Sequence, residues 1–197
     1  DRINEGYPIL SWQAGDGETD PDAPEMDPNG WDGKASDAAP SQIDGIYQIT
    51  SPAELKWFAN AAAVTQEIQG ILKANLDLNN QPWTPIGGIT AEKAFAGSLD
   101  GGGFTISNLY VKSSGPAGLF YYNAGETKNL TVSGLVIGAD YCAGITARNA
   151  GSITDCATAV TVRGSNHTAG ITGYNYGGTV SRCQNSGSIQ GGQYVAG

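Results

Sequence analysis

The chain has 197 residues, of which 40% are hydrophobic, so it is long enough to bury one sizeable core and too apolar to be disordered. Its formal net charge of -9 argues against nucleic-acid binding, because proteins that bind nucleic acids neutralise phosphates with lysine and arginine. It contains no run of about 18 or more apolar residues and no charged-then-apolar leader at Asp1, so we expect no membrane insertion.

The first two segments differ in character from the rest of the chain. Residues 1–14 contain a short apolar and aromatic patch, which predicts either the end of a preceding module or a strand that packs on the domain. Residues 15–44 hold nine of the nineteen acids and one base, a composition typical of an acidic linker or long loop. A loose calcium site is the alternative, although the pattern lacks the glycine and the terminal glutamate of an EF-hand loop. The acids that would form it are Asp16, Glu18, Asp20 and Asp22.

Residues 45–112 combine one helix with several short strands. Ser51-Pro52-Ala53-Glu54 is a capping box with proline at the first helical position, and an apolar stripe follows it through about Val64. Alternating apolar residues predict strands at 46–49, 71–78, 95–100 and 104–106.

Residues 113–197 repeat themselves. Ala-Gly pairs start at positions 117, 143, 169 and 196, which are intervals of 26, 26 and 27 residues. A fixed period predicts a solenoid, and units rich in Thr, Val, Ile, Ser and Gly without a leucine framework exclude a leucine-rich repeat. We therefore predict an all-β fold, a parallel β-helix (β-solenoid) with coils of about 26 residues.

Equivalent residues of adjacent coils are expected to stack about 4.8 Å apart into ladders. The end coil of a solenoid exposes its core, so the helix of residues 45–112 is expected to belong to an N-terminal cap with the irregular first coils. The sequence stops two residues into a fourth coil, from which we expect a truncated piece of a longer protein whose further repeats would stack on this one. The predicted ladders are Leu119/Ile145/Ile171, Leu130/Cys156/Cys183, Asn123/Asn149/Asn175, Asn129/Asp155/Arg182 and Tyr141/His167/Tyr194.

Three cysteines cannot pair completely, and their spacing matches no zinc motif. Since Cys156 and Cys183 occupy the same ladder, we interpret them as small buried apolar residues, with a disulfide between adjacent coils as the alternative.

The order of motifs over residues 45–197 resembles extracellular bacterial proteins that carry GLUG repeats. The similarity departs from the usual repeat where Tyr121-Tyr122 and Ala147-Arg148 replace Gly-Tyr before the asparagine. The resemblance implies a secreted or cell-wall-attached adhesin-like surface protein, of a kind also found beside IgA-protease-type peptidases, and it implies no catalytic residues. The matching segments are 47–59, 74–78, 83–87, 95–101, 105–109, 117–120, 143–146 and 169–175, with a weaker match at 6–13.

Catalysis finds little support in the residues themselves. His167 is the one histidine of the sequence, so a Ser/His/Asp or Cys/His arrangement is nearly excluded. A carbohydrate-active enzyme of the polysaccharide-lyase or glycosidase type needs two neighbouring carboxylates, whereas Glu126, Asp140 and Asp155 occupy different positions in their coils. We predict a non-catalytic stalk or adhesion module without a cofactor, unless calcium binds, and keep the carbohydrate-active enzyme as the alternative.

Aromatic side chains supply the candidate binding site. Columns of aromatic residues on a surface are suited to recognising a host or matrix glycan or protein. The other interpretation is that such a stack only stabilises the solenoid, as cross-strand pairs do. The candidate ligand-binding residues are Tyr141, His167, Tyr194, Tyr174 and Tyr176.

Overall fold

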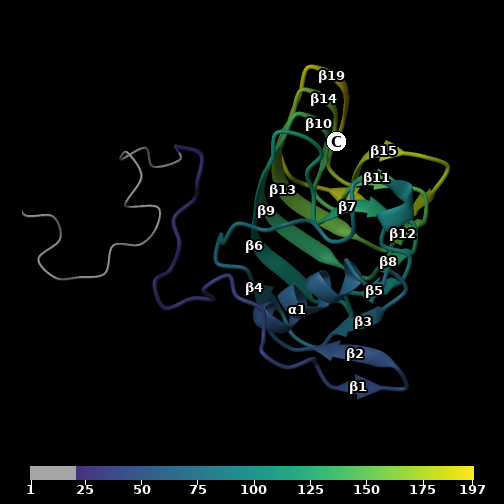
Figure 1. Cartoon of the computed structure of the whole chain (residues 1–197). Helices are drawn as coiled ribbons and strands as arrows, with labels where there is room; N and C mark the ends of the chain where they lie inside the picture. Colours follow the sequence, from purple (N-terminus) through teal and green to yellow (C-terminus); the bar gives the residue numbers. More distant parts are fainter. Residues whose placement is uncertain (1–20) are drawn as a thin grey trace, which may run out of the picture.

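The computed structural model describes residues 21–197 and shows a β-solenoid of about 6 turns, with stacked parallel coils of about 26 residues (Figure 1). The parallel β-helix expected from the repeat is thus confirmed. Every strand pair of the described chain is parallel except the hairpin formed by β1 and β2.

Four sheets form the walls of the coils. The longest has the order β1 (Gln42–Ile43), β2 (Ile46–Ile49), β3 (Gln69–Leu72), β5 (Ser98–Asp100), β8 (Glu126–Lys128), β12 (Ser152–Thr154), β16 (Thr179–Ser181). The second has the order β4 (Leu76–Asp77), β6 (Thr105–Lys112), β9 (Thr131–Ile137), β13 (Ala157–Arg163), β17 (Gln184–Asn185), and β18 (Ile189–Gln190) also pairs with β13. The two short sheets are β7 (Phe120–Asn123), β11 (Thr146–Asn149), β15 (Thr172–Asn175) and β10 (Asp140–Ala143), β14 (Asn166–Ala169), β19 (Gln193–Ala196).

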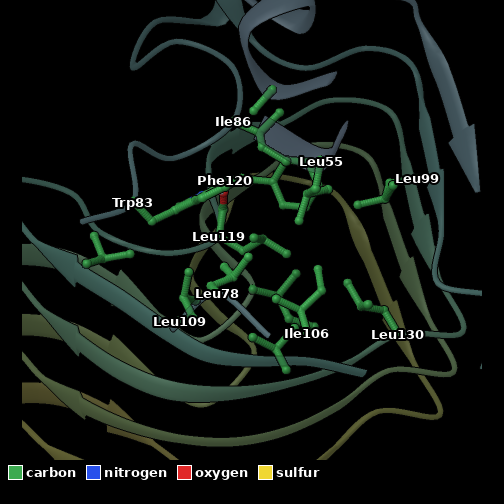
Figure 2. Close-up of a cluster of buried hydrophobic side chains, with 14 of the residues drawn as sticks. Leu55, Leu78, Trp83, Ile86, Leu99, Ile106, Leu109, Leu119, Phe120 and Leu130 are labelled. Carbon is green, nitrogen blue, oxygen red and sulfur yellow. The ribbon is translucent and has the colours of Figure 1, made fainter. Parts of the chain in front are cut away.

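The registers place equivalent residues of successive coils on top of one another. Asn149 pairs with Asn123 in β7 and with Asn175 in β15, and their side-chain amides are hydrogen-bonded along the ladder. In the Leu130/Cys156/Cys183 ladder, Cys156 is buried and Cys183 is half-buried, and both thiols are free. Large apolar side chains fill the interior of the coils (Figure 2).

The helix α1 (Pro52–Ala62) connects β2 to β3 at one end of the solenoid (Figure 1). Ser51 caps it by accepting a hydrogen bond from the backbone N–H of Glu54, and the helix ends two residues before Val64, the position expected from the sequence. The ring of Phe58 lies 6.1 Å from that of Phe95, so the helix buries its apolar stripe against the core of the first coils. The short 3-10 helix η1 (Ala91–Lys93) lies in the loop between β4 and β5.

The strand predicted over residues 71–78 is wrong in one respect, because two strands in different sheets replace it. β3 ends at Leu72 and β4 begins at Leu76, so the chain turns a corner of the coil between them. Leu72, Leu76 and Leu78 are all fully buried on either side of this corner. The corner preserves the alternation of inward and outward residues, and the apolar pattern alone therefore cannot reveal it.

Residues 21–44 run mostly as a loop that contacts the first coils. Asn79 holds it by accepting from the backbone N–H of Asp27 (2.7 Å) and donating to the carbonyl of the same residue (2.8 Å). The ring of Trp31 lies 6.4 Å from that of Trp83. The patch predicted within residues 1–14 lies outside the described residues. Across residues 21–197, no helix has the length and apolarity needed to cross a bilayer.

Candidate ligand-binding cavity

The aromatic ladder predicted from the repeat is present as a continuous stack. The ring of His167 lies 4.8 Å from that of Tyr141 and 4.7 Å from that of Tyr194, with interplanar angles of 25° and 19°. The three residues occupy equivalent positions in β10, β14 and β19. One face of the solenoid therefore carries a column of parallel rings.

This ladder has an unusual backbone. Tyr141, His167 and Tyr194 have φ values of 60°, 52° and 53°, in the left-handed region that bulky side chains rarely adopt. Each such residue costs roughly 1–2 kcal/mol, whereas a stacked aromatic pair contributes roughly 0.5–1.5 kcal/mol beyond its buried area. Two stacked pairs therefore do not clearly offset three strained residues. All three members of the outer polar ladder, Asn129, Asp155 and Arg182, adopt the same φ, and asparagine and aspartate tolerate it better than other side chains do.

Stability alone thus gives a weak reason for aromatic residues at these turns. Nδ1 of His167 adds to the cost, since it is buried and finds no hydrogen-bond partner in the described part of the chain. Local strain of this kind is concentrated at functional sites in proteins.

A second ladder runs beside the first. Tyr122, Arg148 and Tyr174 occupy equivalent positions in β7, β11 and β15. Gly173 lets β15 approach closely, because a Cβ there would lie 2.8 Å from the backbone carbon of Tyr141. The Tyr174 ring consequently meets the Tyr141 ring edge-on, with centroids 5.6 Å apart.

The two ladders and a loop line an open cavity of about 380 Å³, within the range of small-ligand sites. The guanidinium of Arg148 lies 4.6 Å above the ring of Tyr141, and its Nη1 donates to the carbonyl of Ile89 (3.4 Å). This contact links β11 to the loop that contains η1. The lining residues are Ala91, Tyr122, Tyr141, Arg148, Tyr174 and Tyr176.

The structure thus brings three of the five predicted ligand-binding residues, Tyr141, Tyr174 and Tyr176, into one cavity. His167 and Tyr194 extend the stack beyond its lining. Sequence reasoning missed Arg148, although it precedes a ladder asparagine by one position, as Tyr122 and Tyr174 do. Ala91 lies in a loop outside the repeat, where no sequence signal marks it.

Three of the four predicted calcium ligands, Asp16, Glu18 and Asp20, lie outside the described residues. Asp22 is described, and its carboxylate contacts Nζ of Lys112 (3.3 Å) and Nη1 of Arg163 (3.2 Å). Within residues 21–197, no three or more His, Cys, Asp or Glu side chains are grouped so that they could hold a metal ion.

Several groups that could carry chemistry are engaged in other contacts. The carboxylate of Asp155 accepts two hydrogen bonds from Arg182, which hold its pKa below the usual range. Glu126 pairs with Lys128 at 2.7 Å. Burial raises the thiol pKa of Cys142 to about 11 and that of Cys156 to about 12, so little reactive thiolate forms at neutral pH.

Comparison with known proteins adds one structural neighbour. No protein-family model and no curated protein sequence matches the chain. A crystal structure of a "putative immunoglobulin A1 protease" from Bacteroides ovatus matches with a TM-score of 0.59 and 18% identity. The shared feature is the fold. The match covers 82% of this chain and 61% of the Bacteroides chain, and at this identity it shows the architecture alone.

Proposed function

We propose that this solenoid is a non-catalytic recognition and spacer module of a secreted or cell-surface bacterial protein, and that its cavity binds a saccharide of host or matrix origin. The observation that carries the proposal is the cavity of about 380 Å³ with four tyrosines in its lining. Sugar rings present C–H-rich faces that pack on aromatic rings, and phenolic hydroxyls donate to and accept from sugar hydroxyls.

Exposure of the aromatic side chains supports this assignment. Tyr174 is 41% exposed and Tyr176 is 65% exposed, although large aromatic side chains usually bury most of their surface. Tyr174 lies in β15 and Tyr176 in the bend just after it, and neighbouring exposed rings of this kind form a recognition surface that loses little side-chain entropy on binding. The centroids of the two rings are 6.2 Å apart and the ring planes differ by 32°, so both rings can contact one ligand.

The absence of catalysis is part of the proposal. No carboxylate lines the cavity among the described residues, and the ring of His167 is held between two tyrosines.

An extracellular location is supported by the resemblance to GLUG-repeat proteins. The name of the Bacteroides ovatus neighbour, a protease of immunoglobulin A1, is compatible with it.

A glycan-array screen of this chain tests the proposal, with Tyr176→Ala as the perturbed variant. Tyr194→Ala is the matched control, because this tyrosine is similarly exposed (72%) but lies outside the cavity lining. We expect saccharide binding by the wild-type chain and by the control, and at least a tenfold loss in Tyr176→Ala. If neither the wild type nor the control binds any saccharide while both remain folded by circular dichroism, the proposed function is wrong.

A further inference from the structure

Arg148 is the one charged residue in the cavity lining. Within the described chain, no carboxylate forms an ion pair with it, whereas Arg163 pairs with Asp22 and Arg182 pairs with Asp155. A half-buried guanidinium without an acidic partner therefore stands out at this position.

The contacts of Arg148 hold the guanidinium without using up its donors. Tyr141 packs against its flat face at 4.6 Å, and the carbonyl of Ile89 accepts from Nη1 alone. A guanidinium has five N–H donors in its plane, so most of them stay available to a ligand. Two parallel N–H groups of this kind match the two oxygens of a carboxylate, which is the strongest pairing that arginine makes.

The walls of the cavity restrict what accompanies that carboxylate. Tyr122, Tyr174 and Tyr176 contribute aromatic side chains next to the charge, and no described acidic residue is part of the lining. A ligand that fits has an apolar face, several hydroxyls and a negative charge within one ring. A pyranose that bears a carboxylate combines all three.

We propose that the cavity selects saccharides that carry a carboxylate, of the uronic-acid or sialic-acid type, with Arg148 binding the carboxylate and the tyrosines packing on the sugar ring. This inference rests on the saccharide-binding function proposed above. Arg148 is the specificity-determining residue, and the tyrosines supply the affinity that neutral sugars share.

Two acid–neutral pairs of probes test it by titration calorimetry: trigalacturonic acid with its methyl ester, and sialyllactose with lactose. In Arg148→Gln we expect the acidic probe of the bound pair to bind about 10- to 100-fold more weakly, as loss of hydrogen bonds to a charged group implies. The neutral partner is expected to lose less affinity in this variant than its acid does, because it lacks the negative charge that Arg148 would pair with. Arg163→Gln is the matched control, since this arginine contacts Asp22 away from the cavity, and it should bind like the wild type.

The outcomes separate this inference from the function on which it rests. If the ester or lactose binds as tightly as its acid and Arg148→Gln changes neither, selection of the carboxylate is refuted while saccharide binding stands. Tighter binding of a sulfated lactose, or of a short Asp/Glu peptide, would also overturn the assignment to carboxylated sugars. If no saccharide binds the folded wild type, both proposals fail.

Discussion

The asparagine ladder fixes the turns that carry the cavity residues, and Asn149 is its central member. Oδ1 of Asn149 accepts from Nδ2 of Asn123, and its own Nδ2 donates to Oδ1 of Asn175, both at 2.9 Å. The side chain is fully buried. Replacing Asn149 by alanine removes these two buried hydrogen bonds, each worth about 1 kcal/mol, while Nδ2 of Asn123 keeps only long contacts to the carbonyls of Gly125 (3.4 Å) and Ser152 (3.5 Å). We therefore expect a loss of roughly 2–3 kcal/mol in the free energy of unfolding.

Asn175→Ala is the matched control at the exposed end of the same ladder. It removes one ladder bond and the exposed bond from its own Nδ2 to the carbonyl of Gly178 (2.8 Å), and Nδ2 of Asn149 keeps backbone acceptors on Gly151 and Thr179 at 3.4 Å. We expect a loss of about 1 kcal/mol for this variant. Urea denaturation followed by far-ultraviolet circular dichroism measures both values. Equal losses in the two variants, or a loss below about 1 kcal/mol for Asn149→Ala, would refute the idea that the buried ladder bonds hold these turns.

Three further predictions concern the backbone, the aromatic stack and the thiols. Gly173→Ala should lower the free energy of unfolding by about 1–3 kcal/mol through overcrowding, and it should weaken saccharide binding. Gly115→Ala is the control, because its Cβ would meet only a serine oxygen at 4.0 Å, and it should change neither property. Thermal melts measure the stability and titrations measure the binding. Tyr194→Asn should change the unfolding free energy by less than about 1 kcal/mol in urea, because relief of backbone strain offsets the lost stacking; a larger loss would show that the stack is structural. Above about pH 9 the unfolded chain releases thiol protons that buried Cys142 and Cys156 retain in the folded state, so the folded state loses stability as the pH rises. The urea midpoint of the wild type should therefore fall between about pH 9 and 11. It should fall less in a Cys142→Ala/Cys156→Ala variant, which lacks both thiols.

The repeat made most of the coil architecture predictable. A constant interval of 26 residues places Asn123 under Asn149, and Tyr141 under His167, wherever successive coils keep their register. Ladders are therefore a direct consequence of the period. The contact between two ladders is different, because it depends on the cross-section of one coil, which the period does not encode.

Arg148 illustrates this limit. Its place in the ladder of Tyr122 and Tyr174 could be read from the sequence, but its position over Tyr141 depends on how closely β15 and β11 approach β10. Gly173 permits the close approach of β15 to β10, and its role is visible only when the neighbouring backbone is known. The corner between β3 and β4 was not predicted for a similar reason, since a turn that preserves the alternation of inward and outward residues does not change the apolar pattern of the sequence.

The parallel stacking of coils also has a mechanical consequence. The strands lie across the axis of the solenoid, so the hydrogen bonds between coils run along it (Figure 1). Tension applied from end to end therefore acts on the interfaces between coils in series, and each interface carries the whole force. Side-chain ties such as the pair of Asp155 and Arg182 reinforce single interfaces. Additional coils would make such a spacer longer without making it stronger, because its weakest interface sets the force at which it opens.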